Sequence, residues 1–126
     1  MGVEYKGLKM AEIAMNAVKE MIGKSNKDEY LRRVKGLGNM IIQNGLAGTV
    51  LFIKKKGPKE VLEHLDRLVE FKTKIPNISE KIVNELKNTQ NSTLDSNQYL
   101  EAQSAALEGV KWLRRYADIF LGGEES

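Results

Sequence analysis

The sequence predicts an all-α fold, a compact bundle of five to six helices forming a single domain over residues 1–126. Apolar residues recur at three- and four-residue spacing along most of the chain, which is the period of a helix with one buried face. The 126 residues include only two prolines, and both stand at borders between apolar segments. A chain of this length forms one domain that buries roughly two-thirds of the surface its unfolded form exposes.

The first two helices are predicted over residues 3–23 and 28–44. In the first, the apolar stripe includes Leu8 and Ile22, and Gly23 is suited to end it. In the second, one narrow sector holds four apolar side chains, those of Tyr30, Val34, Leu37 and Ile41. The pair Asn44-Gly45 then stops the helix, because glycine adopts the left-handed conformation without steric penalty.

Residues 46–56 form the ambiguous element. The run Thr49-Val50-Leu51-Phe52-Ile53 has the composition of a strand, yet the chain offers no second convincing strand for it to pair with. A lone buried strand would leave backbone hydrogen-bonding groups unpaired, which is costly. We therefore predict a buried helix that packs on the preceding one across a very short turn.

Three further helices are predicted over residues 58–74, 79–90 and 97–121, followed by a tail at 122–126. In the first of these, Glu63 and Arg67 are spaced to form an ion pair one turn apart. Ser79 or Asn77 is expected to cap the next helix, which turns Leu86 inward. The polar residues 88–93 are expected to form a loop before the last and longest helix.

The last helix carries more apolar surface than one buried face can use. Its main stripe runs from Tyr99 to Phe120, and a second apolar sector, turned about a third of a circle away, includes Trp112, Tyr116 and Ile119. A helix that is apolar on two sides either lies in the centre of a bundle or exposes one side to a partner. We take Trp112, Tyr116 and Ile119 as candidate protein-contact residues, and the sequence leaves both alternatives open.

The net charge of +3 conceals a division along the chain. Residues 1–59 hold 12 Lys/Arg against 5 Asp/Glu, a net of +7, whereas residues 60–126 hold 8 against 12, a net of −4. Such asymmetry is typical of a protein with one side toward a polyanion, and an uneven but merely solvated surface is the alternative. The candidate contacts to a polyanion backbone or to an acidic partner are Arg32, Arg33, Lys54, Lys55, Lys56, Lys111, Arg114 and Arg115.

The sequence indicates no catalytic residue, no metal site and no cofactor. Without cysteine there is no disulfide, no thiolate chemistry and no Cys-based metal site. The one histidine, His64, is flanked by charged residues and is interpreted as a surface side chain. A phosphotransfer role for His64 is the enzymatic alternative, although the Lys and Gly typical after such a histidine are missing. No apolar run approaches the ~20 residues of a membrane span, so we expect a cytoplasmic protein without membrane contact.

Two blocks of the chain resemble the signature of a known family. The first runs from Leu37 to Leu46, ends in Asn-Gly-Leu, and continues with Thr49-Val50-Leu51-Phe52. The second lies in the last helix and consists of Tyr99, Ala106-Leu107, Trp112-Leu113-Arg114-Arg115 and Ala117. Together they span about residues 30–120 and are similar to the small all-helical subunit of the type III-B CRISPR (Cmr) RNA-targeting complex.

The resemblance implies a structural subunit without catalysis, acting in antiviral defence. The partners it implies are the other subunits of the effector complex, guide RNA and target RNA through direct or indirect contact, and further copies of the chain. Those copies would stack head to tail in a minor filament beside the backbone that carries guide RNA. The family has no short catalytic or metal motif, so no site residue is transferred, and the eight cations above become candidate RNA-backbone contacts. The alternative is an unrelated small helical adaptor for an acidic protein partner.

Overall fold

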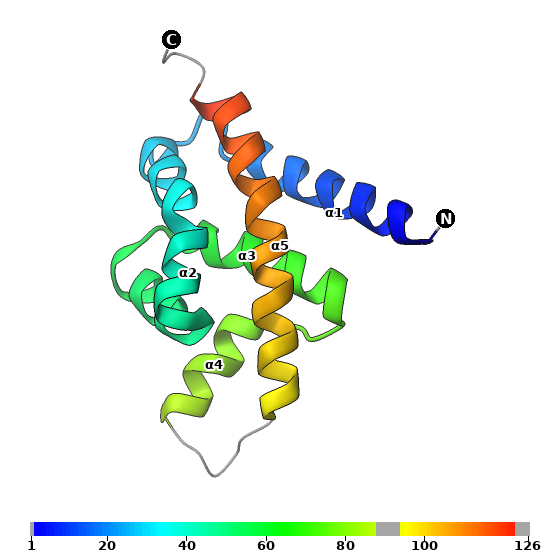
Figure 1. Ribbon diagram of the computed structural model, residues 1–126. Coiled ribbons are helices and arrows are strands. Elements are labelled where there is room, and N and C mark those ends of the chain that lie inside the picture. Colours follow the sequence, from blue (N-terminus) through cyan, green and yellow to red (C-terminus); the bar gives the residue numbers. More distant parts are fainter. Residues whose placement is uncertain (1, 88–93, 123–126) are drawn as a thin grey trace.

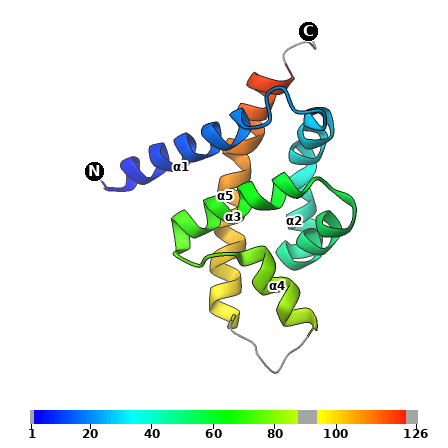
Figure 2. The ribbon, with the colours of Figure 1, turned by 180° about the vertical axis from the view of Figure 1, so that it is seen from behind.

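The computed structural model describes residues 2–87 and 94–122, with side chains from residue 7 onward. These residues form five helices: α1 (Gly2–Lys19), α2 (Lys27–Lys56), α3 (Lys59–Thr73), α4 (Ile78–Lys87) and α5 (Ser96–Leu121). The fold is an all-helical compact single domain, as predicted, and Figures 1 and 2 show it from opposite sides. The predicted loop at 88–93 and the tail at 123–126 lie outside the described residues.

Helix α5 runs along the length of the bundle and packs against α1, α2 and α3. In both views α3 crosses α5 steeply, and α4 lies at the end of the bundle where α5 begins (Figures 1 and 2). The first turns of α1 extend away from the body of the bundle. Because three helices share α5 as their neighbour, most of its apolar surface is used inside the protein.

Helix α2 is broken at Gly45, where φ is 76° and ψ is 166°. The stop predicted at the Asn-Gly pair is therefore a sharp bend between two helical halves. The bend frees backbone N–H groups at the start of the second half, and α5 satisfies two of them. The N–H of Leu46 donates to Gln103 Oε1 at 2.8 Å. The N–H of Ala47 donates to the Tyr99 hydroxyl at 2.9 Å, so side chains distant in sequence cap the second half of α2.

The strand-like segment after the bend is helical, as predicted. One of its faces is buried through Leu46, Thr49, Val50 and Ile53. Leu51 and Phe52 are exposed by 43% and 37%. Among the described helices, α2 is long and apolar enough to cross a membrane. Since α2 bends at Gly45 and buries residues of both halves among the other helices, we interpret it as a core helix.

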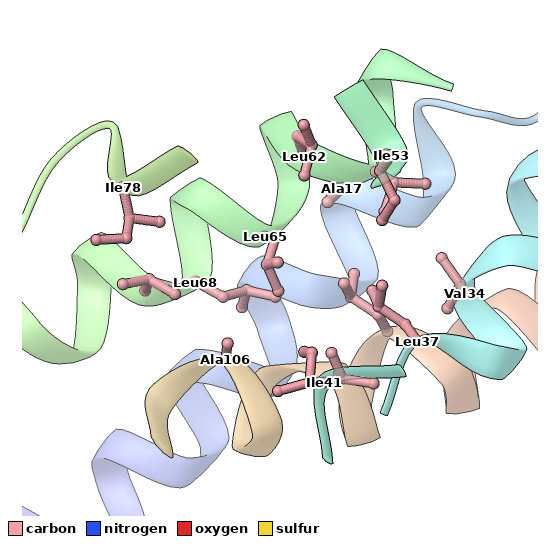
Figure 3. Packing of buried hydrophobic residues seen from close by; sticks show 14 of the residues in the cluster. Ala17, Val34, Leu37, Ile41, Ile53, Leu62, Leu65, Leu68, Ile78 and Ala106 are labelled. Carbon is pink, nitrogen blue, oxygen red and sulfur yellow. The ribbon is translucent and has the colours of Figure 1, made fainter. Parts of the chain in front are cut away.

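The core gathers buried apolar side chains from all five helices. Figure 3 shows Leu37 and Ile41 of α2, Leu65 of α3 and Ala106 of α5 converging between these helices. The sector predicted for the first half of α2 is fully buried, which confirms the helical period there; its members are Tyr30, Val34, Leu37 and Ile41. The hydrophobic effect at this junction holds the bundle together.

Three side chains that were predicted to face inward are exposed. Leu8 is 68% exposed, because the buried face of α1 is centred on Met10, Ala14 and Ala17, and Leu8 lies to one side of it. Ile22 is 54% exposed, because α1 ends at Lys19 and the helical spacing does not continue through the turn that follows. Leu86 is 56% exposed and borders a surface cleft between α4 and α5.

The interpretation of His64 as a surface residue is wrong, because its side chain is completely buried. Its Nδ1 atom lies 2.7 Å from the Tyr30 hydroxyl, and its Nε2 atom lies 3.2 Å from the Glu20 carboxylate. Arg67 donates to the same carboxylate at 2.7 and 2.9 Å, and so pairs with Glu20 instead of the predicted Glu63. Glu63 and Arg67 are exposed, whereas the imidazole joins α3 to α2 and to the turn after α1.

Burial also decides the protonation of this network. It lowers the pKa of His64 and raises the pKa of Tyr30, so both groups are neutral at pH 7. The hydrogen bonds from Arg67 lower the pKa of Glu20, which stays ionised. A neutral imidazole facing this carboxylate donates from Nε2 and accepts from Tyr30 at Nδ1. An imidazole enclosed in this way is not placed to take a phosphoryl group.

Helix α4 is capped by a side chain from α3. Asp66 accepts hydrogen bonds from the backbone N–H and the hydroxyl of Ser79, at 3.0 and 2.7 Å. The predicted cap, Ser79 or Asn77, is therefore replaced by a carboxylate that precedes Ser79 by 13 residues. Burial raises the pKa of Asp66. This contact fixes the start of α4 against α3.

Candidate interaction surfaces

None of the eight candidate cations forms an ion pair with another described residue. Seven of them are exposed, and Arg33 is half-buried. By contrast, Lys35 lies 3.4 Å from Asp118, and Lys72 lies 2.9 Å from Glu108. Cations without an internal partner remain available to anions of another molecule.

A groove of about 390 Å³ lies between the first half of α2 and α5. We call it the basic groove; it is lined by Lys35, Gly38, Asn39, Ile42, Leu107, Val110, Lys111 and Arg114. Its three cations stand around an apolar floor, and Ile42 is 70% exposed. Arg32 precedes Lys35 by one helical turn and extends the same face of α2. The structure thus brings Arg32, Lys111 and Arg114 to one side of the molecule.

A second basic surface forms where the bend at Gly45 folds the two halves of α2 against each other. The guanidinium of Arg33 lies 4.9 Å from the centre of the Phe52 ring. Lys55 and Lys56 follow Phe52 by three and four residues, which places them on the same side of the helix. We call these four residues the Arg33–Phe52 surface. Lys54 lies apart from them, close enough to Asp66 to oppose the rise in its pKa.

Three aromatic side chains form a ladder along α5. The ring centres of Trp112 and Tyr116 are 6.3 Å apart, and those of Tyr116 and Phe120 are 6.2 Å apart. Arg115 lies over Trp112 at 5.5 Å, and Lys19 of α1 lies over Phe120 at 5.3 Å. Sequence reasoning did not link Phe120 to the other two rings, although the spacing of four residues is the signal that could have done so.

The predicted protein-contact residues lie at the edge of the core. Trp112 and Tyr116 are half-buried, whereas Ile119 is 58% exposed. Trp112 borders a pocket of about 300 Å³ together with Glu108, Lys111 and Arg115. The sequence left open whether this side of α5 is buried in the bundle or exposed to a partner. Both apply in part, because the three aromatic rings pack on the core and still reach the surface.

A further cleft, of about 440 Å³, opens between α4, the start of α5 and the second half of α2. We call it the acidic cleft; it is lined by Ala47, Ile82, Glu85, Leu86, Leu94, Asp95, Ser96, Tyr99 and Leu100. Leu86 and Leu100 are 56% and 59% exposed, and Glu85 and Asp95 supply negative charge. Sequence reasoning missed this cleft, because residues of three separate helices create it and no local pattern marks it.

The described residues hold no group of three or more His, Cys, Asp or Glu side chains placed to bind a metal ion. What they do present is a basic groove, an acidic cleft and two surfaces where cations lie over aromatic rings. Charged grooves with apolar floors are typical of surfaces that bind other macromolecules. The fold and these surfaces define a small helical protein that works through binding.

Comparison with known proteins identifies its family. A family model described as "CRISPR-associated protein (Cas_Cmr5)" matches residues 7–120. The chain is 47% identical over 126 residues to a Thermotoga maritima protein named "CRISPR system Cmr subunit Cmr5", with 100% of the chain and 92% of that relative covered. No solved structure matches the chain. The chain belongs to the Cmr5 family, the non-catalytic structural subunit of the type III-B CRISPR Cmr complex.

Family membership confirms the resemblance carried by the two sequence blocks. It also confirms the prediction of a structural subunit without catalysis, whose partners are the other subunits of the Cmr complex. The alternatives of an unrelated adaptor and of phosphotransfer at His64 are set aside, the second also because His64 is buried.

We expect Trp112→Ala to impair assembly more than folding. The indole is half-buried, so its loss should lower the free energy of unfolding by about 2 kcal/mol, less than the 3–5 kcal/mol of a fully buried ring. Co-purification with the other Cmr subunits should fall much further. Urea unfolding and co-purification measure the two effects. Ile119→Ala serves as a control for folding only, since Ile119 is 58% exposed but is itself a predicted contact residue. If Trp112→Ala unfolds the isolated chain, the indole is a core residue.

Proposed function

We propose that the chain is an architectural subunit that stacks with further copies of itself into a minor filament in the cytoplasm. The filament lies beside the backbone of the Cmr complex that carries guide RNA, and the basic surfaces of the chain contact guide or target RNA. The proposal builds on the family and on the surfaces described above.

The observation that supports the stacking is the opposite charge of two hollows on the same chain, the basic groove and the acidic cleft. Both combine an apolar floor with exposed aliphatic side chains, Ile42 in the groove and Leu86 and Leu100 in the cleft. Their charges are opposite, so the cations around the groove can lie against the carboxylates of the cleft while the exposed aliphatic side chains pack together. A contact between two different faces of one chain is heterologous and continues from copy to copy, which is what a filament requires.

The RNA contacts fall to the cations outside that contact. Arg33, Lys55 and Lys56 lie on the Arg33–Phe52 surface, away from the basic groove that the neighbouring copy would fill. Lys and Arg side chains bind phosphates without reading sequence. In this arrangement the basic groove binds carboxylates of the next copy, and the Arg33–Phe52 surface binds RNA phosphates.

Charge reversal in the two faces tests the stacking. In Cmr complexes assembled with the purified subunits, Arg114→Glu or Glu85→Lys alone should reduce the number of copies per complex, since each opposes the charge of the facing surface. An equal mixture of the two variants should restore stacking in alternating order. The intact groove of one variant meets the intact cleft of the other, and at the next contact both charges are reversed and so again have opposite signs. Native mass spectrometry counts the copies.

The matched control is Lys59→Glu, a reversal of the same size at an exposed position outside both faces. It should leave the copy number unchanged. Full assembly by both single variants would contradict the proposed stacking surfaces. A loss in both variants that mixing does not restore would show that the two faces do not meet.

A further inference from the structure

Whereas the exposed Arg67 is held by a carboxylate, the Arg33 side chain lies against an aromatic ring. Its guanidinium lies 4.9 Å from the centre of the Phe52 ring, within the range of a cation–π contact. Arg67, by comparison, donates two hydrogen bonds to Glu20. Arg33 forms no ion pair within the described residues, and its Nε atom is buried there without a hydrogen-bond partner.

An arginine of this kind is positioned and yet has unused donors. Stacking fixes the plane of the guanidinium, so less conformational freedom is lost when it binds a planar or anionic group. The terminal nitrogen atoms of the guanidinium form no ion pair within the described residues, so they are available to an acceptor on a ligand. Phe52, at 37% exposed, leaves part of its ring open beside this cation.

Two lysines complete the surface. Lys55 and Lys56 stand one turn after Phe52 on the same side of α2, and both are exposed. An aromatic ring beside three cations is the combination by which proteins hold single-stranded nucleic acid: bases stack on the ring and phosphates follow the positive charge. The sequence alone favoured contact with the RNA backbone only, because it predicted the break at Gly45 but not that Phe52 would be exposed beside Arg33.

We propose that the Arg33–Phe52 surface binds single-stranded RNA through one unpaired base. The base packs against Phe52 and the Arg33 guanidinium, and the adjoining phosphates bind Lys55 and Lys56. This inference rests on the proposed RNA contact and adds to it a stacked base, so the surface distinguishes single-stranded from fully paired RNA. A paired strand keeps its bases inside the duplex and offers only phosphates.

Binding of a fluorescent single-stranded oligoribonucleotide tests the stacked base. Phe52→Leu keeps an apolar side chain but removes the ring, and Arg33→Lys keeps the charge but removes the plane. Each should weaken binding about tenfold, as expected for the loss of one base–aromatic contact. Arg32→Lys, the matched control at the neighbouring exposed arginine, should change binding less than about twofold. With an abasic strand or a duplex of equal charge, wild type and variants should bind alike.

Cross-linking in the assembled Cmr complex locates the contact. RNA carrying 5-iodouridine should form a photoadduct with the peptide that contains Phe52, and Phe52→Leu should abolish it. If binding is salt-sensitive but unchanged by Phe52→Leu and Arg33→Lys, and adducts form elsewhere on the chain, the stacked base is overturned. The proposed RNA contact would then still hold. If the chain neither binds the RNA nor forms any adduct, both the stacked base and the proposed RNA contact are overturned. Equal competition by a polyglutamate peptide of matched charge would assign the surface to an acidic protein segment and overturn the inference.

Discussion

Replacing Gly45 with alanine is expected to lower the free energy of unfolding by about 2–3 kcal/mol. The φ of 76° and ψ of 166° at Gly45 lie in a region that is essentially restricted to glycine. An added β-carbon would also stand 3.3 Å from the Tyr99 hydroxyl and 3.6 Å from Gln103 Oε1. The substitution therefore strains the backbone and crowds the Tyr99 hydroxyl, one of the two groups that cap the second half of α2.

Urea unfolding followed by circular dichroism measures this loss, and Gly36→Ala is the matched control. Gly36 lies in the first half of the same helix, and a β-carbon there would meet nothing within 4 Å. Alanine is the better helix former, so this control should gain about 0.5–1 kcal/mol. Similar effects at the two glycines would contradict the special role of the bend.

The bend also explains why the two blocks of the family signature occur together. Gly45 and Leu46 belong to the first block, and Tyr99, whose hydroxyl accepts from Ala47, belongs to the second. Without Tyr99 and Gln103, a helix bent at this point would leave two backbone N–H groups without protein partners. The two blocks therefore form one structural unit.

Replacing His64 with alanine is expected to lower the free energy of unfolding by about 3–4 kcal/mol. The imidazole is completely buried, so its removal leaves a cavity. The hydroxyl of Tyr30, 2.7 Å from Nδ1, would also remain in the interior without its acceptor. Urea unfolding at pH 7 measures the change. Glu63→Ala, at the exposed position directly before His64, should stay within about 0.5 kcal/mol, and an equal loss there would contradict the network's importance.

The His64→Ala variant should also lose part of the pH dependence of the free energy of unfolding. Burial lowers the pKa of His64 below 6.5 in the folded state, so the unfolded state binds the proton first. The stability from the neutral imidazole is complete above pH 6.5 and falls as the pH drops toward the folded-state pKa, by up to about 1.4 kcal/mol per pH unit. The pKa of Glu20 is lowered from 4.5, so its contribution is lost only in stronger acid. A wild-type slope between about pH 6.5 and 5 that persists in His64→Ala would exclude His64 as its source.

Local patterns in the sequence predicted the helices and the break at the Asn-Gly pair, because both depend on residues within one or two turns. The same patterns failed at His64, whose charged neighbours suggested a surface position. Its burial depends on Glu20, which is 44 residues away in the chain. No short window contains that information, since only the packing of α3 against the end of α1 creates the site.

The candidate surfaces divide in the same way. The cations themselves could be listed from the sequence. The structure then divides most of them between the side of the basic groove and the Arg33–Phe52 surface, while Lys54 lies near Asp66 and Arg115 lies over Trp112. The acidic cleft could not be predicted, because Ala47, Glu85 and Leu100 come together only in the folded chain. The tertiary fold thus decides which exposed residues act as one surface.

Lys111 lines both the basic groove and the pocket beside Trp112. One ammonium group can neutralise one carboxylate or phosphate fully, so two anions bound on either side of it must share its charge. If one neighbour occupies the groove, it would therefore weaken the binding of another in the pocket, and by thermodynamic reciprocity the reverse is equally true. Negative cooperativity of this kind would make the two hollows compete for a single cation.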